Sequence, residues 1–242
     1  MELTDKIRRV HEASDGSYGS PRVHEQLLAQ GETACVHTVA KCMKEAGICV
    51  KARKAFVPKT TESDPTHQTF DNVLDREFDV PSPNQKWVGD ITYIPTLAGW
   101  VYLAVIIDLY SRKVVGWSMS EHLRSELAGE ALALAIESRR PGVGLLHHSD
   151  RGVQYTSDDY QQLLNEHQIQ CSMSGVGQCW DNAVAESFFS TMKREHVNGQ
   201  TYQSLREARS SVFQWIECWY NRQRLHSTLG YKSPEMFEAQ MN

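Results

Sequence analysis

Three carboxylates stand where they could take part in metal chemistry: Asp90 in WVGDITYIP, Asp150 in HHSDRGVQYTS and Glu186 in WDNAVAESFF. The first two lie within or at the end of apolar, β-branched runs, and the third lies in a segment with helical periodicity. Mg²⁺ and Mn²⁺ prefer oxygen ligands and keep positions open for water and phosphate. Two such ions about 4 Å apart stabilise both the attacking and the leaving oxygen of a phosphodiester. The three acids therefore predict metal-dependent phosphodiester chemistry.

Each acid also has a plainer explanation. Asp90 could be an exposed alternate residue of a strand, and Asp150 an ordinary turn residue in Ser-Asp-Arg-Gly. Glu186 could belong to a solvated helix face. Asp108, at the end of YLAVIID, competes for a place in the acid cluster, but we expect it to serve the end of a strand.

The helical neighbours of Glu186 favour the chemical interpretation. Asn182, Ser190 and Lys193 lie one or two turns away and share its face. An amide and an ammonium that flank a metal-directed carboxylate suit contact with a phosphate. Asn182 and Lys193 are therefore candidate DNA-binding residues.

His147 and His148 could act as zinc ligands or as a general base. No Cys or His stands at a matching spacing, so we expect both to be strand residues near the site. The six cysteines form no Cys-x-x-Cys pair, which predicts reduced, structural thiols rather than a zinc site.

The composition is that of an ordinary globular protein, with 242 residues, 40% hydrophobic and 23% charged. No run of apolar residues is long enough to span a membrane, and the start MELTDKIRRV has no secretory core, so we expect a cytoplasmic protein without membrane association. The net charge of −5 is unevenly distributed: +1 over residues 1–65, −8 over 66–187 and +2 over 188–242. Residues 41–59 form a modest basic patch, in which Lys41, Lys44 and Arg53 are candidate DNA contacts.

Residues 1–57 are expected to form a helical region. Helices are predicted over residues 21–29, with Ser20 as N-cap and Val23, Leu27 and Leu28 as the apolar stripe, and over residues 36–46. Two short helices around a glycine-containing turn resemble a DNA-binding helix-turn-helix, although a plain helical bundle fits the same pattern. Residues 58–70 are polar, contain two prolines in PKTTESDPT, and predict a linker.

Residues 71–200 change to an alternation of strands and helices. Strands are predicted over 87–96, 101–108, 113–118, 145–149 and 169–173, and helices over 125–138, from Ser157 onward, and over 181–196. The apolar face of the first of these helices is predicted to consist of Leu127, Ala131, Leu134 and Ala135. The order βββαβαβα implies an α/β fold with a mixed sheet flanked by helices. Residues 201–242 predict a helical extension, with a stripe of Leu205, Ala208, Val212, Trp215 and Trp219 and a short helix begun by Ser233-Pro234.

At these motifs the chain resembles the integrase-core (DDE) transposases of bacterial insertion sequences, the second-frame product of the IS-three family, which are related to retroviral integrases. The resemblance covers nearly the whole chain. It rests on the following motifs: Tyr18-Gly19, Arg22-Val23, Asn72-x-Leu74-x-Arg76-x-Phe78, Pro83-Asn84, Trp87-x-x-Asp90-Ile91-Thr92, His148-Ser149-Asp150-Arg151-Gly152-x-Gln154-Tyr155, Cys179-Trp180-Asp181-Asn182-Ala183, Tyr220-Asn221-x-x-Arg224-x-His226 and Leu229-Gly230-Tyr231-x-Ser233-Pro234.

The resemblance implies an RNase H-like core in which Asp90, Asp150 and Glu186 match the family's catalytic metal ligands. Lys193 matches a basic residue thought to contact DNA near the cleaved phosphate. It further implies that two Mg²⁺ or Mn²⁺ ions support the nicking of double-stranded DNA at the element's ends, followed by transfer of the freed 3′-hydroxyl to target DNA. A homo-oligomer on nucleoid DNA, and a helix-turn-helix protein from an upstream frame, are the implied partners.

Two other functions fit the same motifs. An RNase H-like nuclease would hydrolyse DNA without strand transfer. An inactive or regulatory DNA-binding protein would bind without reacting, although the intact acid triad speaks against it.

Overall fold

The computed structural model describes residues 2–50, 69–175 and 178–241. At its centre lies a five-stranded sheet in the order β3-β2-β1-β4-β5. The strands are β1 (Lys86–Thr96), β2 (Gly99–Asp108), β3 (Val114–Ser120), β4 (Leu146–Ser149) and β5 (Gln170–Met173). β1 pairs antiparallel with β2 and parallel with β4. The predicted mixed sheet is therefore confirmed, with each predicted strand boundary within two residues of the observed one.

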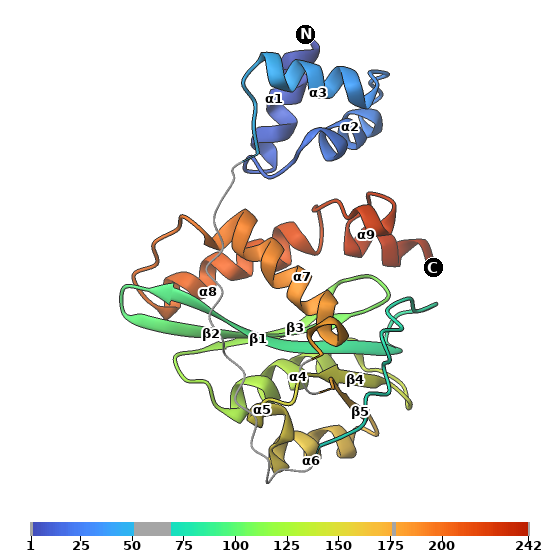
Figure 1. Cartoon of the computed structure of the whole chain (residues 1–242), viewed down its shortest axis with the longest axis vertical. Coiled ribbons are helices and arrows are strands. Elements are labelled where there is room, and N and C mark those ends of the chain that lie inside the picture. The colour runs from blue at the N-terminus through green and yellow to red at the C-terminus, as the bar shows by residue number, and fades with distance from the viewer. Residues whose placement is uncertain (1, 51–68, 176–177, 242) are drawn as a thin grey trace.

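Helices cover both faces of the sheet (Figure 1). Against one face pack α4 (Ser125–Arg139), α5 (Val153–Thr156) and α6 (Asp158–Glu166). Against the other face pack α7 (Ala183–Met192), the π-helix η2 (Lys193–Val197), α8 (Leu205–Phe213) and the π-helix η3 (Gln214–Tyr220). Because both faces are covered, β2 reads as a nearly continuous apolar run rather than as an alternating one.

α4 approaches β3 closely, and a glycine permits it. A Cβ atom at Gly116 would lie 2.3 Å from the Ala131 carbonyl oxygen and 2.6 Å from the Ala135 amide nitrogen. The buried band of α4 includes Ala128, Ala131 and Ala135, but Leu134, which the sequence places on the apolar face, is 49% exposed. The close approach therefore occurs where Gly116 meets the small residues Ala131 and Ala135.

The N-terminal helices are α1 (Leu3–Ala13), α2 (Ser20–Ala29) and α3 (Val36–Glu45), packed around a small core of their own. Ser20 is the first residue of α2 and Gly19 its N-cap, so the prediction of Ser20 as the cap was wrong by one position. Val23 and Leu27 are buried as predicted, whereas Leu28 is 44% exposed because it turns away from α3. Most of the predicted linker, residues 58–68, and the boundary at 57 lie outside the described residues.

The C-terminal extension continues beyond η3 through the short 3₁₀ turn η4 (Ser227–Leu229) to α9 (Pro234–Glu238) and the 3₁₀ turn η5 (Ala239–Met241). Ser233 caps α9, with its Oγ accepting from the Met236 amide at 3.3 Å, as the sequence predicts. The N-terminal helices rest on this extension, since Tyr18 packs on Trp219 with ring centroids 5.7 Å apart. Of the six cysteines, Cys35, Cys42, Cys49, Cys171 and Cys218 are free thiols. No helix in the described ranges has the length and apolarity needed to cross a bilayer.

Candidate active site

Asp90 and Asp150 are brought together by the register of two parallel strands. β1 and β4 pair with a constant offset of 60 residues, from Lys86 with Leu146 to Val88 with His148. The same offset sets Asp90 beside Asp150, one residue beyond the end of β4. Both residues line one small pocket, together with Tyr93, Tyr102, Leu123, Gln154 and Tyr155. The two predicted aspartates therefore share a site at the carboxyl end of β4.

Local backbone contacts hold the two carboxylates. Oδ1 of Asp90 accepts from the Ile91 amide at 2.8 Å, and Oδ1 of Asp150 accepts from the Gly152 amide at 2.9 Å. The second contact is the Asx-turn geometry that an Asp before Arg-Gly favours. Asp150 is therefore both a turn residue and a member of the acid pair, so the two interpretations of this residue are compatible.

The electrostatics of the pair disfavour two negative charges. The pKa of Asp90 is raised to about 8, chiefly by burial and then by the charges of Asp150 and Glu186, while the Ile91 amide and Lys193 oppose the rise. Like charges held together in a desolvated site are expected to keep a proton unless a cation joins them. The donor set is thus suited to a hard divalent cation.

Glu186 lies on α7 and is exposed. It does not line the pocket, yet it is close enough to contribute to the raised pKa of Asp90. Its own pKa is raised by desolvation. Among the described residues, no three His, Cys, Asp or Glu side chains lie close enough together to hold one metal ion. The fold therefore joins the two aspartates directly and leaves the glutamate nearby.

The start of α7 is fixed to the strand that carries Asp90. Nδ2 of Asn182 donates to the Gly89 carbonyl at 3.4 Å. The preceding residue, Asp181, is buried and accepts from Arg76 Nε at 2.8 Å, from Asn72 Nδ2 at 2.9 Å and from the Gly175 amide at 3.0 Å. The Trp-Asp-Asn motif is thus an anchor for the glutamate helix. As a DNA contact, Asn182 stays a prediction.

The side chain of Lys193 contacts a residue of β1, Tyr93. Its Nζ lies 4.3 Å from the centroid of the Tyr93 ring, a cation–π contact, and its pKa is lowered by desolvation against the opposing charge of Asp90. Tyr93 was not among the residues that the sequence singled out. It stands three positions after Asp90 on β1, but strand alternation would have placed it on the opposite face, so no local signal identifies it.

The two histidines are buried strand residues, as predicted. Nε2 of His147 lies 3.1 Å from the Tyr160 hydroxyl, and His148 lies 2.9 Å from Ser172 Oγ through Nδ1 and 3.1 Å from Ser174 Oγ through Nε2. Desolvation lowers the pKa of His147 to about 3 and that of His148 to about 4. Both are therefore neutral supports of β4.

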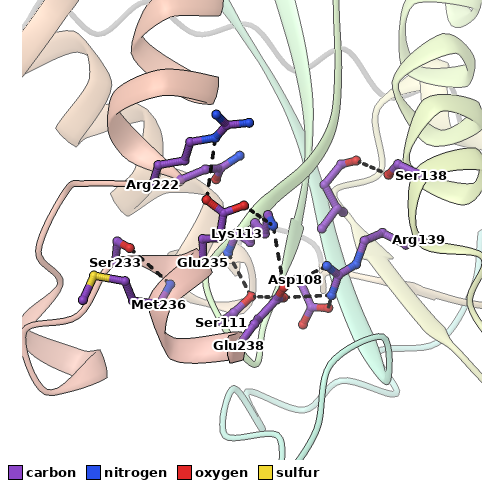
Figure 2. A network of polar contacts seen from close by, with 12 residues as sticks. Asp108, Ser111, Lys113, Ser138, Arg139, Arg222, Ser233, Glu235, Met236 and Glu238 are labelled. Atoms are coloured by element: carbon purple, nitrogen blue, oxygen red, sulfur yellow. Dashed lines mark hydrogen bonds and ion pairs between the residues drawn. The ribbon is translucent and has the colours of Figure 1, made fainter. Parts of the chain in front are cut away.

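Asp108, the competing acid, has a structural role at the carboxyl end of β2, opposite Trp87 near the start of β1. It accepts from the Asn84 amide at 2.7 Å and the Tyr110 amide at 2.9 Å, and Arg139 lies 3.5 Å away. Figure 2 shows that Arg139 also binds Glu238 of α9, at 2.8 and 2.9 Å, and that Lys113 lies between Glu235 and Glu238. This network fastens the C-terminal helix to the sheet, which accounts for the burial of Asp108.

The predicted basic patch is only partly described. Lys41 and Lys44 are exposed on α3, and Lys41 lies 3.9 Å from Glu45 in a surface ion pair. Arg53 lies outside the described residues. The three remain predictions as DNA contacts.

Comparisons with known proteins agree with this architecture. An integrase core domain matches residues 80–179 and, in a second model of that name, residues 167–234, and an HTH-like domain matches residues 1–56. The chain is 45% identical over 221 residues to the transposase InsF of insertion sequence IS3A of Escherichia coli (strain K12), covering 91% of this chain and 76% of that protein. It is 39% identical over 236 residues to the transposase of insertion sequence element IS904 of Lactococcus lactis subsp. lactis (strain IL1403), covering 98% and 93%.

Among solved structures, the chain is similar to one in the simian T-cell lymphotropic virus intasome bound to the PP2A regulatory subunit B56 gamma. The TM-score is 0.52 at 14% identity, covering 96% of this chain and 74% of that chain. The family match and the fold thus define an RNase H-like integrase core, the class of enzymes that cleave and join DNA strands. Within that class, 45% identity to InsF and 39% identity to the IS904 transposase, over 91% and 98% of this chain, show that the chain belongs to the IS3-family transposases.

Proposed function

We propose that Asp90, Asp150 and Glu186 are the metal-binding catalytic residues of this transposase, and that its substrates are the double-stranded ends of an insertion sequence and target DNA. The observation that carries the proposal is the Asp90–Asp150 pair, whose register places two carboxylates in one pocket and raises the pKa of Asp90 to about 8. Two carboxylates that resist joint ionisation form a site that a divalent cation completes.

Two Mg²⁺ or Mn²⁺ ions bound there would stabilise the attacking and leaving oxygens of the scissile phosphodiester. The protein's own residues supply the frame. The amides of Ile91 and Gly152 orient Asp90 and Asp150, and the Asn182 contact with Gly89 holds α7 against the same strand. Glu186 is exposed on the first turn of α7, and its charge contributes to the raised pKa of Asp90, which supports its place as the third ligand.

Lys193 is assigned to the DNA backbone beside the acids. Its ammonium is held over Tyr93, whose ring lines the acid pocket, and a Lys at that position offers a point charge to a phosphate. The HTH-like match over residues 1–56 supports a second DNA contact through the N-terminal helices. Action as a homo-oligomer, and cooperation with a protein from an upstream frame, belong to the same proposal.

The test is the substitution Asp150→Asn, assayed for cleavage and joining of labelled element-end DNA with Mn²⁺. Both activities should fall about a thousandfold or more, the scale seen when a member of a catalytic set is removed, while the unfolding midpoint changes little. Asp159→Asn, the same change at an exposed helix N-terminus, is the control and should leave both activities intact. Strand transfer that survives Asp150→Asn contradicts the assignment, and cleavage without joining by the unchanged chain would favour the nuclease.

A further inference from the structure

Two sequence motifs from opposite ends of the chain meet in the fold, and neither belongs to the acid site. Tyr18 and Arg22 come from the N-terminal helices, and Arg224 and Leu225 from the C-terminal extension. The Tyr18 hydroxyl accepts from the Leu225 amide at 2.8 Å, and Arg22 Nε donates to the Leu225 carbonyl at 2.9 Å. The two motifs therefore form one interface, across about 200 residues of sequence.

A single buried carboxylate lies at the centre of this interface. Glu195, with a side chain 4% exposed, binds Arg224 through two hydrogen bonds of 2.7 Å. Arg22 NH1 lies 3.9 Å from Oε1 of the same carboxylate. One negative charge thus serves three arginines: Arg22 from the N-terminal helices, Arg224 from the C-terminal extension, and Arg194, the neighbour of Glu195 on its own helix, whose NH2 lies 3.9 Å from Oε1. A bidentate guanidinium fixes the direction of the carboxylate as well as its charge.

Glu195 belongs to the helix that carries the glutamate of the acid site. It lies on η2, which continues α7 without a break in helical backbone, nine residues after Glu186 and two after Lys193. Glu186 is exposed, whereas the Glu195 side chain is buried against the C-terminal extension, so the two carboxylates lie on different sides of this helix. The helix therefore presents Glu186 near the acid pair and is held from behind by Glu195.

We propose that the Arg22–Glu195–Arg224 cluster makes the docked N-terminal helices part of the support for the glutamate helix, with Glu195 as the positioning residue. The inference rests on the proposed function only for the roles of Glu186 and Lys193. When Arg22 no longer reaches Glu195, the helix from α7 into η2 loses a fixed point, and Glu186 and Lys193 lose their orientation. Docking of the N-terminal helices and assembly of the catalytic site are thereby coupled.

The test compares full-length variants by amide hydrogen exchange and by single-turnover strand transfer. Arg22→Gln should speed exchange across residues 186–197 at least tenfold and slow strand transfer at least tenfold, with affinity for end DNA within threefold. Arg8→Gln is the matched control, because its partner Asp5, 3.8 Å away, lies on the surface of the same helix. It should change none of the three measurements.

Two further variants separate Glu195 from the rest of the interface. Tyr18→Phe removes the hydroxyl that accepts from the Leu225 amide but leaves Glu195 its arginines, so faster exchange should be confined to residues 3–45 and the Leu225 amide. Arg22→Lys keeps a cation near Glu195 and loses the Nε donor to Leu225, so residues 186–197 should stay protected. Faster exchange in Arg22→Gln that stops at residue 45, or loss of protection at 186–197 in Arg22→Lys, overturns the inference. The exchange measurement tests this inference even if the unchanged chain shows no strand transfer. Absence of strand transfer would contradict the proposed function and not the inference.

Discussion

Lys193 places an ammonium group against Tyr93, a residue that lines the pocket of Asp90 and Asp150. Lys193 lies on η2 and its ammonium contacts the Tyr93 ring, where burial lowers its pKa and the charge of Asp90 opposes that change. This partly desolvated cation is stabilised by the negative charge of Asp90. Under the proposed function, cations bound to the acids would take over that charge and leave the ammonium for a phosphate.

Lys193→Gln should therefore weaken binding to element-end DNA and lower the slope of log affinity against log salt by about one, because one phosphate contact is lost. Fluorescence anisotropy over a range of salt concentrations measures both. Lys113→Gln removes the same charge from the network with Glu235 and Glu238 and should leave the salt slope unchanged. Equal slopes for the unchanged chain and Lys193→Gln would rule out the contact.

At the scale of elements, the approach of α4 to β3 depends on one missing side chain. Gly116→Ala should destabilise the protein by about 3 kcal/mol, because the new methyl group meets helix backbone that cannot move alone. Gly129→Ala, within α4 and with nothing in 4 Å of its Cβ position, should instead stabilise by about 0.5 to 1 kcal/mol. Urea unfolding measures both, and similar effects of the two substitutions would contradict this account.

The elements themselves could largely be predicted, because periodicity is local information. The boundaries of β1, α4 and α9 follow from β-branched runs, an apolar stripe and a Ser-Pro start. Leu28 and Leu134 were misplaced because a stripe shows which residues are apolar, not which way the helix turns when it docks. The Asp90–Asp150 pairing depends on strand order, which the sequence indicated only as a mixed sheet. The position of Tyr93 under Lys193 depends on tertiary packing and had no signal.

At the scale of the whole molecule, three buried histidines among the described residues are held neutral: His147 and His148 on β4, and His226 in the C-terminal extension. Burial lowers the pKa of His226 to about 2, with the charges of Arg224, Arg22 and Arg112 acting in the same direction, and it similarly lowers that of His147 and His148. The unfolded chain takes up these protons below about pH 6.5 and the folded chain does not. The contribution of these histidines to the free energy of unfolding is therefore present above that pH and is lost as the pH falls.

Between pH 7 and pH 5, the free energy of unfolding should fall by about 2 kcal/mol less in His226→Gln than in the unchanged chain. This difference is the contribution of one histidine that is protonated only in the unfolded state. Urea unfolding at pH 7, 6 and 5 measures it. The raised pKa of Asp90 acts in the opposite direction, since that group holds its proton better when folded, but it contributes equally to both proteins and cancels in the comparison. A pH dependence that is the same with and without His226 would show that this histidine is not the source.

The contacts of Tyr18 and Arg22 with Leu225 also constrain the order in which the chain can assemble. The N-terminal helices are synthesised first, yet the surface on which they dock is made near the other end of the sequence. Until that segment emerges and folds, Tyr18 lacks its cover from Trp219, and Arg22 has no carboxylate to face. Bringing these two distant segments together is entropically costly and should come after the sheet has formed. Docking of the N-terminal helices is therefore expected only in chains whose intervening core has already folded.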